Sequence, residues 1–318
     1  MVDIGILVAG WTVWQREFLK VQRLIIVYNP LSTRARKINE EVLADVRKLR
    51  GVMVGKFEVG KTTIVENARR LEGMLSDGDI VVTAGGDGTT EVGVNALCMS
   101  NKDVRLGILP YGNFNDVARG FGLKSLGEVL MAKEEEVYPI EVKVNGGHYQ
   151  YTMGYFTVGM FAMATEVFER KKVRERLKRH DGNLIFSIWM LAGWYFKNRR
   201  RAKLPIFRMD GREMKGVTDV LVVNGRTAAK VMRGGEYYYG RKMLVGVGRL
   251  SNLVSLGIFM MRSMLGRIPG EEMGGVKLVF EKEAVVTMQA EGEYEKLEGV
   301  REMEFLKEGR GIKVLRRG

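Results

Sequence analysis

Cysteine and histidine are scarce in this chain. Its 318 residues include one cysteine, Cys98, and two histidines, His148 and His180. One cysteine cannot form a disulfide within the chain or a cysteine-based zinc site, and two histidines leave little for a histidine-rich metal centre or a Ser-His-Asp nucleophile. The single thiol favours the reducing cytosol, so we expect a cytoplasmic protein.

Long hydrophobic runs are missing as well. The uncharged stretches 182–196 and 250–261 fall short of the roughly 20 residues that a helix needs to cross a bilayer. The apolar residues 4–14 lack the basic flank and the cleavage site of a signal peptide. We therefore expect neither a membrane-spanning helix nor a signal peptide.

Proline is rare and glycine abundant, with five prolines against 40 glycines. Glycine lets the backbone approach a ligand closely, which suits loops that hold phosphate. Hydrophobic residues make up 46% of the chain and charged residues 28%, an ordinary globular composition. The length suggests roughly two domains.

Basic residues outnumber acidic ones by 51 to 38, a formal net charge of +13. Residues 169–203 carry 12 Lys and Arg and three acids around the apolar stretch 182–196. A helix of this kind can rest on an anionic membrane leaflet, so we expect transient peripheral contact with a membrane here. The alternative is a core-packing helix with solvated charged ends.

Strands and helices alternate in the first part of the chain. Apolar segments typical of strands lie at 23–29, 52–59, 79–85 and 104–110, and helical patterns lie at 38–50, 62–75, 89–99 and 115–122. This alternation predicts an α/β layer with a parallel sheet. We expect a Rossmann-like nucleotide-binding domain over residues 1–138.

From about residue 139 the pattern changes to short extended segments, and we expect a mostly antiparallel β-sandwich domain over residues 139–299. The expected strands are 140–146, 148–160, 219–225, 242–248, 276–280 and 284–293. Helical insertions are expected at 165–199 and 250–266. We expect residues 300–318 to pack back on the first domain and a cleft to separate the two domains.

Residues 55–62 (GKFEVGKT) match the pattern of a P-loop. A P-loop needs residues whose backbone can curl around phosphate, whereas Phe57 and Val59 are typical of a strand. No apolar run ending in an aspartate of the Walker B type follows. We therefore interpret this segment as a strand.

Residues 85–89 (GGDGT) are a stronger signal because they follow a strand directly and open a helix. Glycines and the helix N-terminus together offer N–H groups to phosphate. Asp87 would be unfavourable in such a turn without a cation, and Mg²⁺ carried by nucleotide phosphates meets that need. A simple helix-capping turn would explain one or two of these glycines but not three around an acid.

Together with residues 28–32 (YNPLS) and 109–116 (LPYGNFND), this turn resembles the diacylglycerol kinase catalytic family. That family includes bacterial soluble lipid kinases and sphingosine kinases, and it shares a fold with NAD kinase. The resemblance continues through residues 223–225 (VNG), 234–235 (GG) and 291–293 (EGE).

The resemblance implies a set of site residues. Glu293 would be the general base and Glu291 its neighbour; Asp87 would take part in catalysis and, with Glu141, in binding Mg²⁺. A base is needed because a lipid hydroxyl is a poor nucleophile at neutral pH. The residues implied in ATP binding are Asn29, Pro30, Ser32, Thr33, Thr62, Gly85, Gly86, Gly88, Thr89, Glu91, Asn113, Asn115 and Asp116.

Several positions depart from the family pattern. Thr33 stands where the family has glycine, Asn113 where it has threonine, and Glu91 where it has asparagine. Glu141 and Glu291 replace aspartates. The segment 240–250 has no acid where the family has an acidic loop that holds a structural magnesium, so we expect that second metal site to be missing.

The function that the resemblance implies is an ATP- and Mg²⁺-dependent lipid kinase acting on diacylglycerol or a related lipid, with ATP in the interdomain cleft. The alternatives are a nucleotide-binding pseudokinase, favoured by the altered loops, and an NAD kinase-like enzyme. We expect no nucleic-acid partner, because basicity alone predicts only nonspecific binding and no recognition motif is present. The oligomeric state stays open, a homodimer included.

Overall fold

A computed structural model describes most of the chain in two compact units. Unit 1 comprises Met1–Tyr138 with Arg310–Gly318, and unit 2 comprises Pro139–Gly309. Residues 1–22 and most of the basic segment 169–203 lie outside the described residues. The described residues are 23–32, 34–47, 52–112, 115–169, 193–195, 197–198, 203–228, 232–234, 239–250, 252–266, 268–290, 293–307 and 309–318.

Unit 1 is built on a six-stranded sheet in the order β2-β1-β3-β4-β18-β5. The first four strands in this order and β18 run parallel, and β5 pairs antiparallel to β18. The alternation predicted from the sequence is therefore confirmed. The strands are β1 (Arg23–Tyr28), β2 (Met53–Glu58), β3 (Ile80–Gly85), β4 (Arg105–Pro110), β5 (Lys133–Val137) and β18 (Ile312–Arg316).

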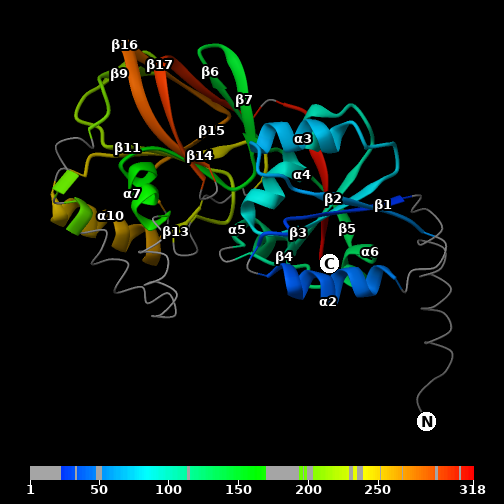
Figure 1. Cartoon of the computed structure of the whole chain (residues 1–318). Helices are drawn as coiled ribbons and strands as arrows, with labels where there is room; N and C mark the ends of the chain where they lie inside the picture. Colours follow the sequence, from blue (N-terminus) through cyan, green and yellow to red (C-terminus); the bar gives the residue numbers. More distant parts are fainter. Residues whose placement is uncertain are drawn as a thin grey trace. The chain divides into compact units, whose positions relative to one another are not determined.

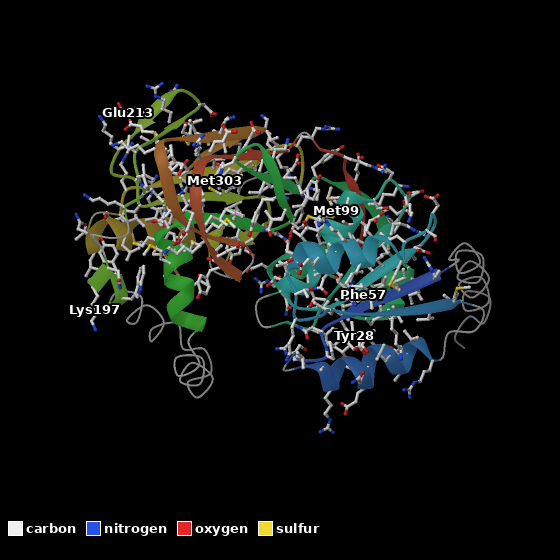
Figure 2. The ribbon with its side chains drawn as sticks, turned by 45° about the horizontal axis from the view of Figure 1, so that its top comes forward. Tyr28, Phe57, Met99, Lys197, Glu213 and Met303 are labelled. Atoms are coloured by element: carbon white, nitrogen blue, oxygen red, sulfur yellow. The ribbon has the colours of Figure 1, made fainter. Side chains whose placement is uncertain are left out.

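Helices cover both faces of this sheet, with α2 and α6 on one face and α3 and α4 on the other (Figure 1). The four central residues of β1, Leu24 to Val27, are completely buried as a result. Tyr28 and Phe57 lie on the neighbouring strands β1 and β2 (Figure 2). The helices are α2 (Ala35–Val46), α3 (Ile64–Glu72), α4 (Asp87–Met99), α5 (Asp116–Phe121) and α6 (Leu126–Leu130).

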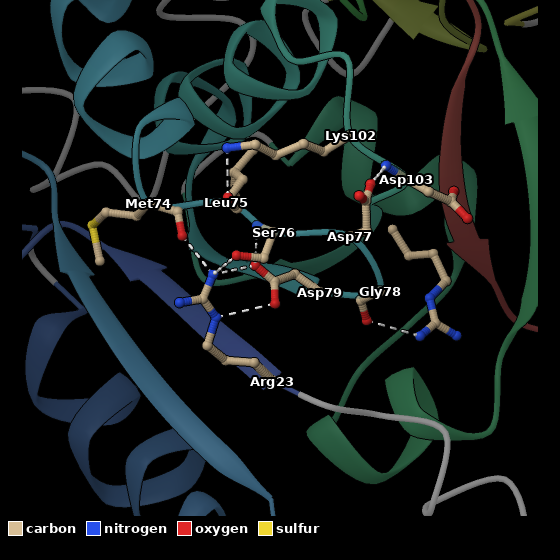
Figure 3. Close-up of polar contacts among 10 residues, drawn as sticks. Arg23, Met74, Leu75, Ser76, Asp77, Gly78, Asp79, Lys102 and Asp103 are labelled. Carbon is tan, nitrogen blue, oxygen red and sulfur yellow. Dashed lines mark hydrogen bonds and ion pairs between the residues drawn. The ribbon is translucent and has the colours of Figure 1, made fainter.

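An ion pair holds the loop that leads into β3. The Arg23 Nε atom donates to Asp79 Oδ1 at 3.0 Å, and the backbone N–H of Ser76 donates to Asp79 Oδ2 at 2.7 Å (Figure 3). Asp79 is buried, so both of its oxygens need partners, and the structure supplies them. This arrangement fixes the amino end of β3, at the edge of the sheet away from the glycine-rich turn.

Unit 2 is built on a ten-stranded antiparallel sheet and a small two-stranded one, which confirms the predicted fold class. Side chains such as Met303 (Figure 2) form its buried core together with Phe156, Phe207 and Phe305. The strands are β6 (Ile140–Val144), β7 (Gly147–Thr152), β8 (Tyr155–Gly159), β9 (Phe207–Met209), β10 (Arg212–Met214), β11 (Asp219–Val223), β12 (Thr227–Ala228), β13 (Met232–Arg233), β14 (Met243–Gly248), β15 (Glu271–Met273), β16 (Gly275–Ala290) and β17 (Glu293–Leu306).

Two features of unit 2 differ from the sequence-based expectation. The expected strands 276–280 and 284–293 form one long strand, β16, up to residue 290, and register shifts between Val279 and Val286 accommodate the polar residues between them. Residues 300–318 were expected to pack on the first domain, but β17 extends through Leu306 within unit 2. Of this expected tail, β18 is the strand that joins the sheet of unit 1.

The helices of unit 2 are α7 (Met160–Glu169) and α10 (Leu253–Leu265). α7 begins five residues before the expected start at 165, because the buried carboxylate of Asp219 accepts a hydrogen bond from the backbone N–H of Phe161 at 2.7 Å and so stabilises the first turn. Among the described residues, no helix has the length and apolarity required to cross a membrane.

Candidate functional site

The loops that follow β3 and β4 meet at the carboxyl ends of these adjacent strands. Gly85 and Pro110 are paired in register, and the backbone N–H of Tyr111 donates to Gly85 O at 3.0 Å. A Cβ atom on Gly112 would lie 2.2 Å from the Cα atom of Gly86. The two loops therefore touch backbone to backbone, which only glycine allows here.

Asp87 is the first residue of α4, directly after the turn formed by Gly85 and Gly86. Its Oδ2 atom accepts a hydrogen bond from the backbone N–H of Asn115 at 3.0 Å. Thr89 packs against Gly85, where a Cβ atom would lie 2.4 Å from Thr89 Oγ1. The glycines and the N-terminus of α4 are thus placed together as the sequence predicts, and their binding of phosphate stays a prediction.

Asn115 fixes the second loop. Its φ of 54° lies in the left-handed region, which asparagine tolerates better than most residues. Its side-chain Oδ1 atom accepts from the N–H of Gly112 at 2.7 Å, and its Nδ2 atom donates to Gly112 O at 2.8 Å. The side chain of Asn115 therefore holds the backbone of Gly112 through two hydrogen bonds, immediately before α5 begins at Asp116.

Asp87 and Asp116 are two buried carboxylates close enough to interact. Burial, and after it the negative charge of Asp116, raise the pKa of Asp87 from 3.8 to about 6. The guanidinium of Arg119 forms an ion pair with Asp116 Oδ1 and partly offsets this effect. One positive charge faces two carboxylates, so the pair is electrostatically suited to a further cation.

Arg119 is absent from the residues selected from the sequence. The spacing could have revealed it, because a residue three positions after Asp116 lies on the same face of a helix.

The two carboxylates can be compared with the ligands that Mg²⁺ prefers. Mg²⁺ prefers oxygen ligands and is commonly bound through one or two carboxylates together with nucleotide phosphates. The buried carboxylates of Asp87 and Asp116 fit that description.

Glu141, the other predicted metal ligand, lies on β6 of unit 2. Its Oε1 atom is 3.1 Å from His148 Nδ1 and its Oε2 atom is 3.7 Å from Lys143 Nζ. Across the described ranges, no group of three or more His, Cys, Asp or Glu side chains forms a ready metal site. The role of Glu141 in binding Mg²⁺ stays a prediction.

Glu293 is the first residue of β17, and its backbone pairs with Ala290 at the end of β16. Glu291 lies outside the described residues, as do Thr33 and Asn113. The predicted base therefore lies at the beginning of β17, one of the two longest strands of unit 2, and its catalytic role stays a prediction.

The loop after β1 lies at the same edge of the sheet as the glycine-rich turn, because β1 is the neighbour of β3. Asn29 Oδ1 accepts from the N–H of Leu31 at 2.9 Å, and Asn29 O accepts from the N–H of Ser32 at 3.1 Å, so Asn29, Pro30 and Ser32 form a tight turn. This turn leads into α2.

Thr62 lies exposed just before α3, while Thr63 is the residue that caps it. The Thr63 hydroxyl accepts from the N–H of Glu66 at 3.2 Å, and the Glu66 carboxylate accepts from the N–H of Thr63 at 3.2 Å. The hydroxyl of Thr63 is thus engaged in a capping box. Thr62 remains our predicted nucleotide contact of the two.

The structure also bears on the P-loop pattern and on the predicted nucleotide contact of Glu91. Residues 55–58 of the P-loop pattern are paired with β1 as part of β2, so a P-loop at this place is excluded. Glu91 is completely buried within α4, so a direct contact with nucleotide would require a change in its burial.

Comparisons with known proteins agree with this geometry. Residues 23–142 match the family model of the diacylglycerol kinase catalytic domain. The chain is 31% identical over 136 residues to a protein of Bacillus subtilis (strain 168) named diacylglycerol kinase, an alignment that covers 41% of this chain and 44% of the relative. It is 29% identical over 130 residues to a diacylglycerol kinase of Staphylococcus carnosus (strain TM300), covering 40% of each. The chain thus spans less than half the length of these curated relatives.

A likeness to solved structures extends over both units. The crystal structure of a diacylglycerol kinase from Bacillus anthracis str. Sterne superposes with a TM-score of 0.63 and 14% identity, covering 93% of this chain and 97% of that one. At this identity the likeness concerns the fold.

Proposed function

We propose that this chain is an ATP- and Mg²⁺-dependent kinase of the diacylglycerol kinase type, because its residues 23–142 match the family model of the diacylglycerol kinase catalytic domain. Its substrate would be a hydroxyl group of diacylglycerol or a related membrane lipid, which places it in phospholipid metabolism. The observation that carries this proposal is the buried pair of Asp87 and Asp116 beside a glycine-rich helix N-terminus.

The nucleotide phosphates are proposed to bind at the N-terminus of α4. Gly85, Gly86 and Gly88 leave room for the backbone to approach phosphate, and the helix dipole favours its negative charge. Asn115 holds the second loop in place from the other side. The turn of Asn29 to Ser32 and the exposed Thr62 complete the predicted set.

Asp87 and Asp116 would hold Mg²⁺. The metal would supply positive charge to the phosphate oxygens. Asp87 must be ionised to bind a cation, so its raised pKa means that binding releases a proton in part of the population near pH 6. Arg119 orients Asp116 through their ion pair.

Glu293 is proposed as the general base that accepts the proton of the lipid hydroxyl, with Glu291 and Glu141 as the acids of the same family positions. Removing that proton makes the oxygen a competent nucleophile for an in-line phosphate. Peripheral membrane contact through residues 169–203 would bring the enzyme to its substrate.

The test is transfer of labelled γ-phosphate from ATP with Mg²⁺ to lipids in mixed micelles. Wild type should give a chloroform-extractable product, Glu293→Gln should lose it while still binding ATP, and Glu298→Gln should keep it. Glu298 is a matched control because it lies exposed on the same strand. ATP binding with no labelled lipid would favour a nucleotide-binding pseudokinase, and labelled NAD in lipid-free solution would favour an NAD kinase-like enzyme.

A further inference from the structure

Helix α10 of unit 2 has apolar side chains on two faces. Leu256 and Phe259 are buried in the core beneath the helix. Val254, Ile258, Met261 and Leu265 are 70%, 48%, 54% and 75% exposed. Their spacing of four, three and four residues places them on one face, where a surface helix normally carries polar groups. We call these four residues the α10 stripe.

The α10 stripe ends in a hollow. A cavity of about 430 Å³ is lined by Met261, Arg262, Leu265 and Gly266. Its lining joins two side chains of the stripe to the guanidinium group of Arg262, which is itself exposed. The surface therefore offers apolar contact with a positive charge at its rim.

Two segments of the sequence carry the excess of positive charge, and one of them contains α10. Residues 226–270 contain eight Lys and Arg and one Glu, a net charge of +7. Residues 169–203 contain 12 Lys and Arg and three acids, a net charge of +9. Together these two segments exceed the +13 of the whole chain, so the rest of the chain is net acidic.

Both basic segments meet α10 through their described residues. Tyr195 OH donates to Leu250 O at 2.5 Å, and Trp194 packs on the same buried cluster as α10. Lys197, two residues after Tyr195, is exposed and projects outward (Figure 2). The strand β13 contributes exposed Arg233, whose carbonyl accepts from the N–H of Ile268 at 2.9 Å. The next acids along the chain after α10 come on β15.

We propose that the α10 stripe docks on the surface of an anionic lipid bilayer. Its four apolar side chains would enter the boundary between headgroups and acyl chains, and Lys197, Arg233 and Arg262 would contact lipid phosphates. A second copy of the chain is a poorer partner, because it would bring the same positive surface against this one. The proposed function already includes membrane contact through residues 169–203, and the α10 stripe adds a second surface whose docking needs neither nucleotide nor catalysis.

The test is sedimentation of nucleotide-free protein with vesicles of phosphatidylcholine and phosphatidylglycerol in equal parts. Wild type is expected to bind these vesicles and to bind pure phosphatidylcholine weakly. The double variant Ile258→Ser, Met261→Ser is expected to bind at least about tenfold more weakly. Met131→Ser is the matched control, because Met131 is 72% exposed on unit 1, away from the stripe in the sequence.

A charge variant separates the two contributions. Arg262→Gln should weaken binding at low salt and have little effect at high salt, where surface charges are screened. Binding that the double variant leaves unchanged would overturn the proposal. So would a wild-type dimer that the double variant dissociates in sedimentation velocity, or a loss of thermal stability without any change in vesicle binding, because the stripe would then pack against protein.

The outcome is separable from the kinase proposal. The double variant should keep its activity towards lipid presented in detergent micelles. If wild type bound anionic vesicles but transferred no phosphate in any assay, the docking surface would stand and the proposed function would fall.

Discussion

The two ends of strand β3 present two buried aspartates in opposite surroundings. At the amino end, Asp79 receives two hydrogen bonds from the Arg23 guanidinium and one from the backbone N–H of Ser76 (Figure 3). At the carboxyl end, Asp87 lies beside a second carboxylate, Asp116, and its pKa is raised to about 6.

The difference separates an acid that stabilises the fold, Asp79, from Asp87, for which we propose a role in binding a cation. A buried carboxylate with a cation of its own needs nothing more from its surroundings. Two neighbouring buried carboxylates disfavour each other's charged form, and a bound cation would offset that repulsion. A raised pKa of this kind is typical of functional sites.

The largest expected effect comes from Asp87→Asn. The variant should lose phosphate transfer by at least about 100-fold, because a group that stabilises charge during transfer is removed. Its free energy of unfolding should stay the same or rise, since a carboxylate beside Asp116 is replaced by a neutral side chain. Rate measurements in micelles and urea unfolding check the two parts, and retained activity would show that Asp87 is a structural acid like Asp79.

Asp219 is a third buried aspartate that can be compared with Asp79 and Asp87. In the described structure, its Oδ2 atom has no hydrogen-bond partner. Burial raises its pKa from 3.8 to about 7. A carboxyl with a raised folded-state pKa stabilises the fold fully below pH 4 and loses this contribution as pH rises through about 7, a change on the order of 4 kcal/mol. Asp219→Asn should reduce the change in the free energy of unfolding between about pH 4 and pH 7, measured by urea unfolding. The control variant Asp77→Asn, at an exposed residue, should leave that change as it is in wild type.

Asp79→Asn should lower the free energy of unfolding by about 2 kcal/mol, less than for a fully buried pair because the Arg23 side chain is 26% exposed. The remaining folded protein should transfer phosphate at the wild-type rate. A double-mutant cycle with Arg23→Gln isolates the pair in urea unfolding. A loss of turnover in fully folded Asp79→Asn would contradict the structural role.

The smallest effects concern two glycines, Gly78 just before β3 and Gly112 in the loop after β4. Gly112→Ala places a Cβ atom 2.2 Å from Gly86 Cα, so it should separate the two loops and weaken ATP binding by about tenfold. Gly78→Ala meets no atom within 4 Å, but its φ of +82° should cost about 1 kcal/mol of stability. Calorimetric titration with ATP and urea unfolding should show opposite patterns for the two variants.

Much of unit 1 could be predicted because its signals are local. Apolar runs of strand length alternate with helical spacing, and the glycines of residues 85–89 indicate a tight turn between a strand and a helix. The contact between Gly86 and Gly112 could not be predicted in the same way, because it depends on which strands become neighbours in the sheet. The ion pair of Arg119 with Asp116 could have been predicted from helical spacing alone.

Unit 2 was harder to predict because its strands pair across long distances in sequence. The polar residues 281–283 resemble a turn, yet bulges carry β16 through them without a break. The α10 stripe was missed for a different reason. Its residues look like core residues in sequence, and only the fold shows which face of the helix is buried.

The most direct test of the account is binding of Mn²⁺ with ATP, followed by electron paramagnetic resonance, in wild type, Asp87→Asn and Asp79→Asn. Mn²⁺ replaces Mg²⁺ because it accepts the same oxygen ligands and is paramagnetic. Wild type and folded Asp79→Asn should bind Mn²⁺ with similar affinity, and Asp87→Asn should bind it at least about tenfold more weakly. Equal binding by wild type and Asp87→Asn would contradict the claim that the carboxyl end of β3 is built for a cation.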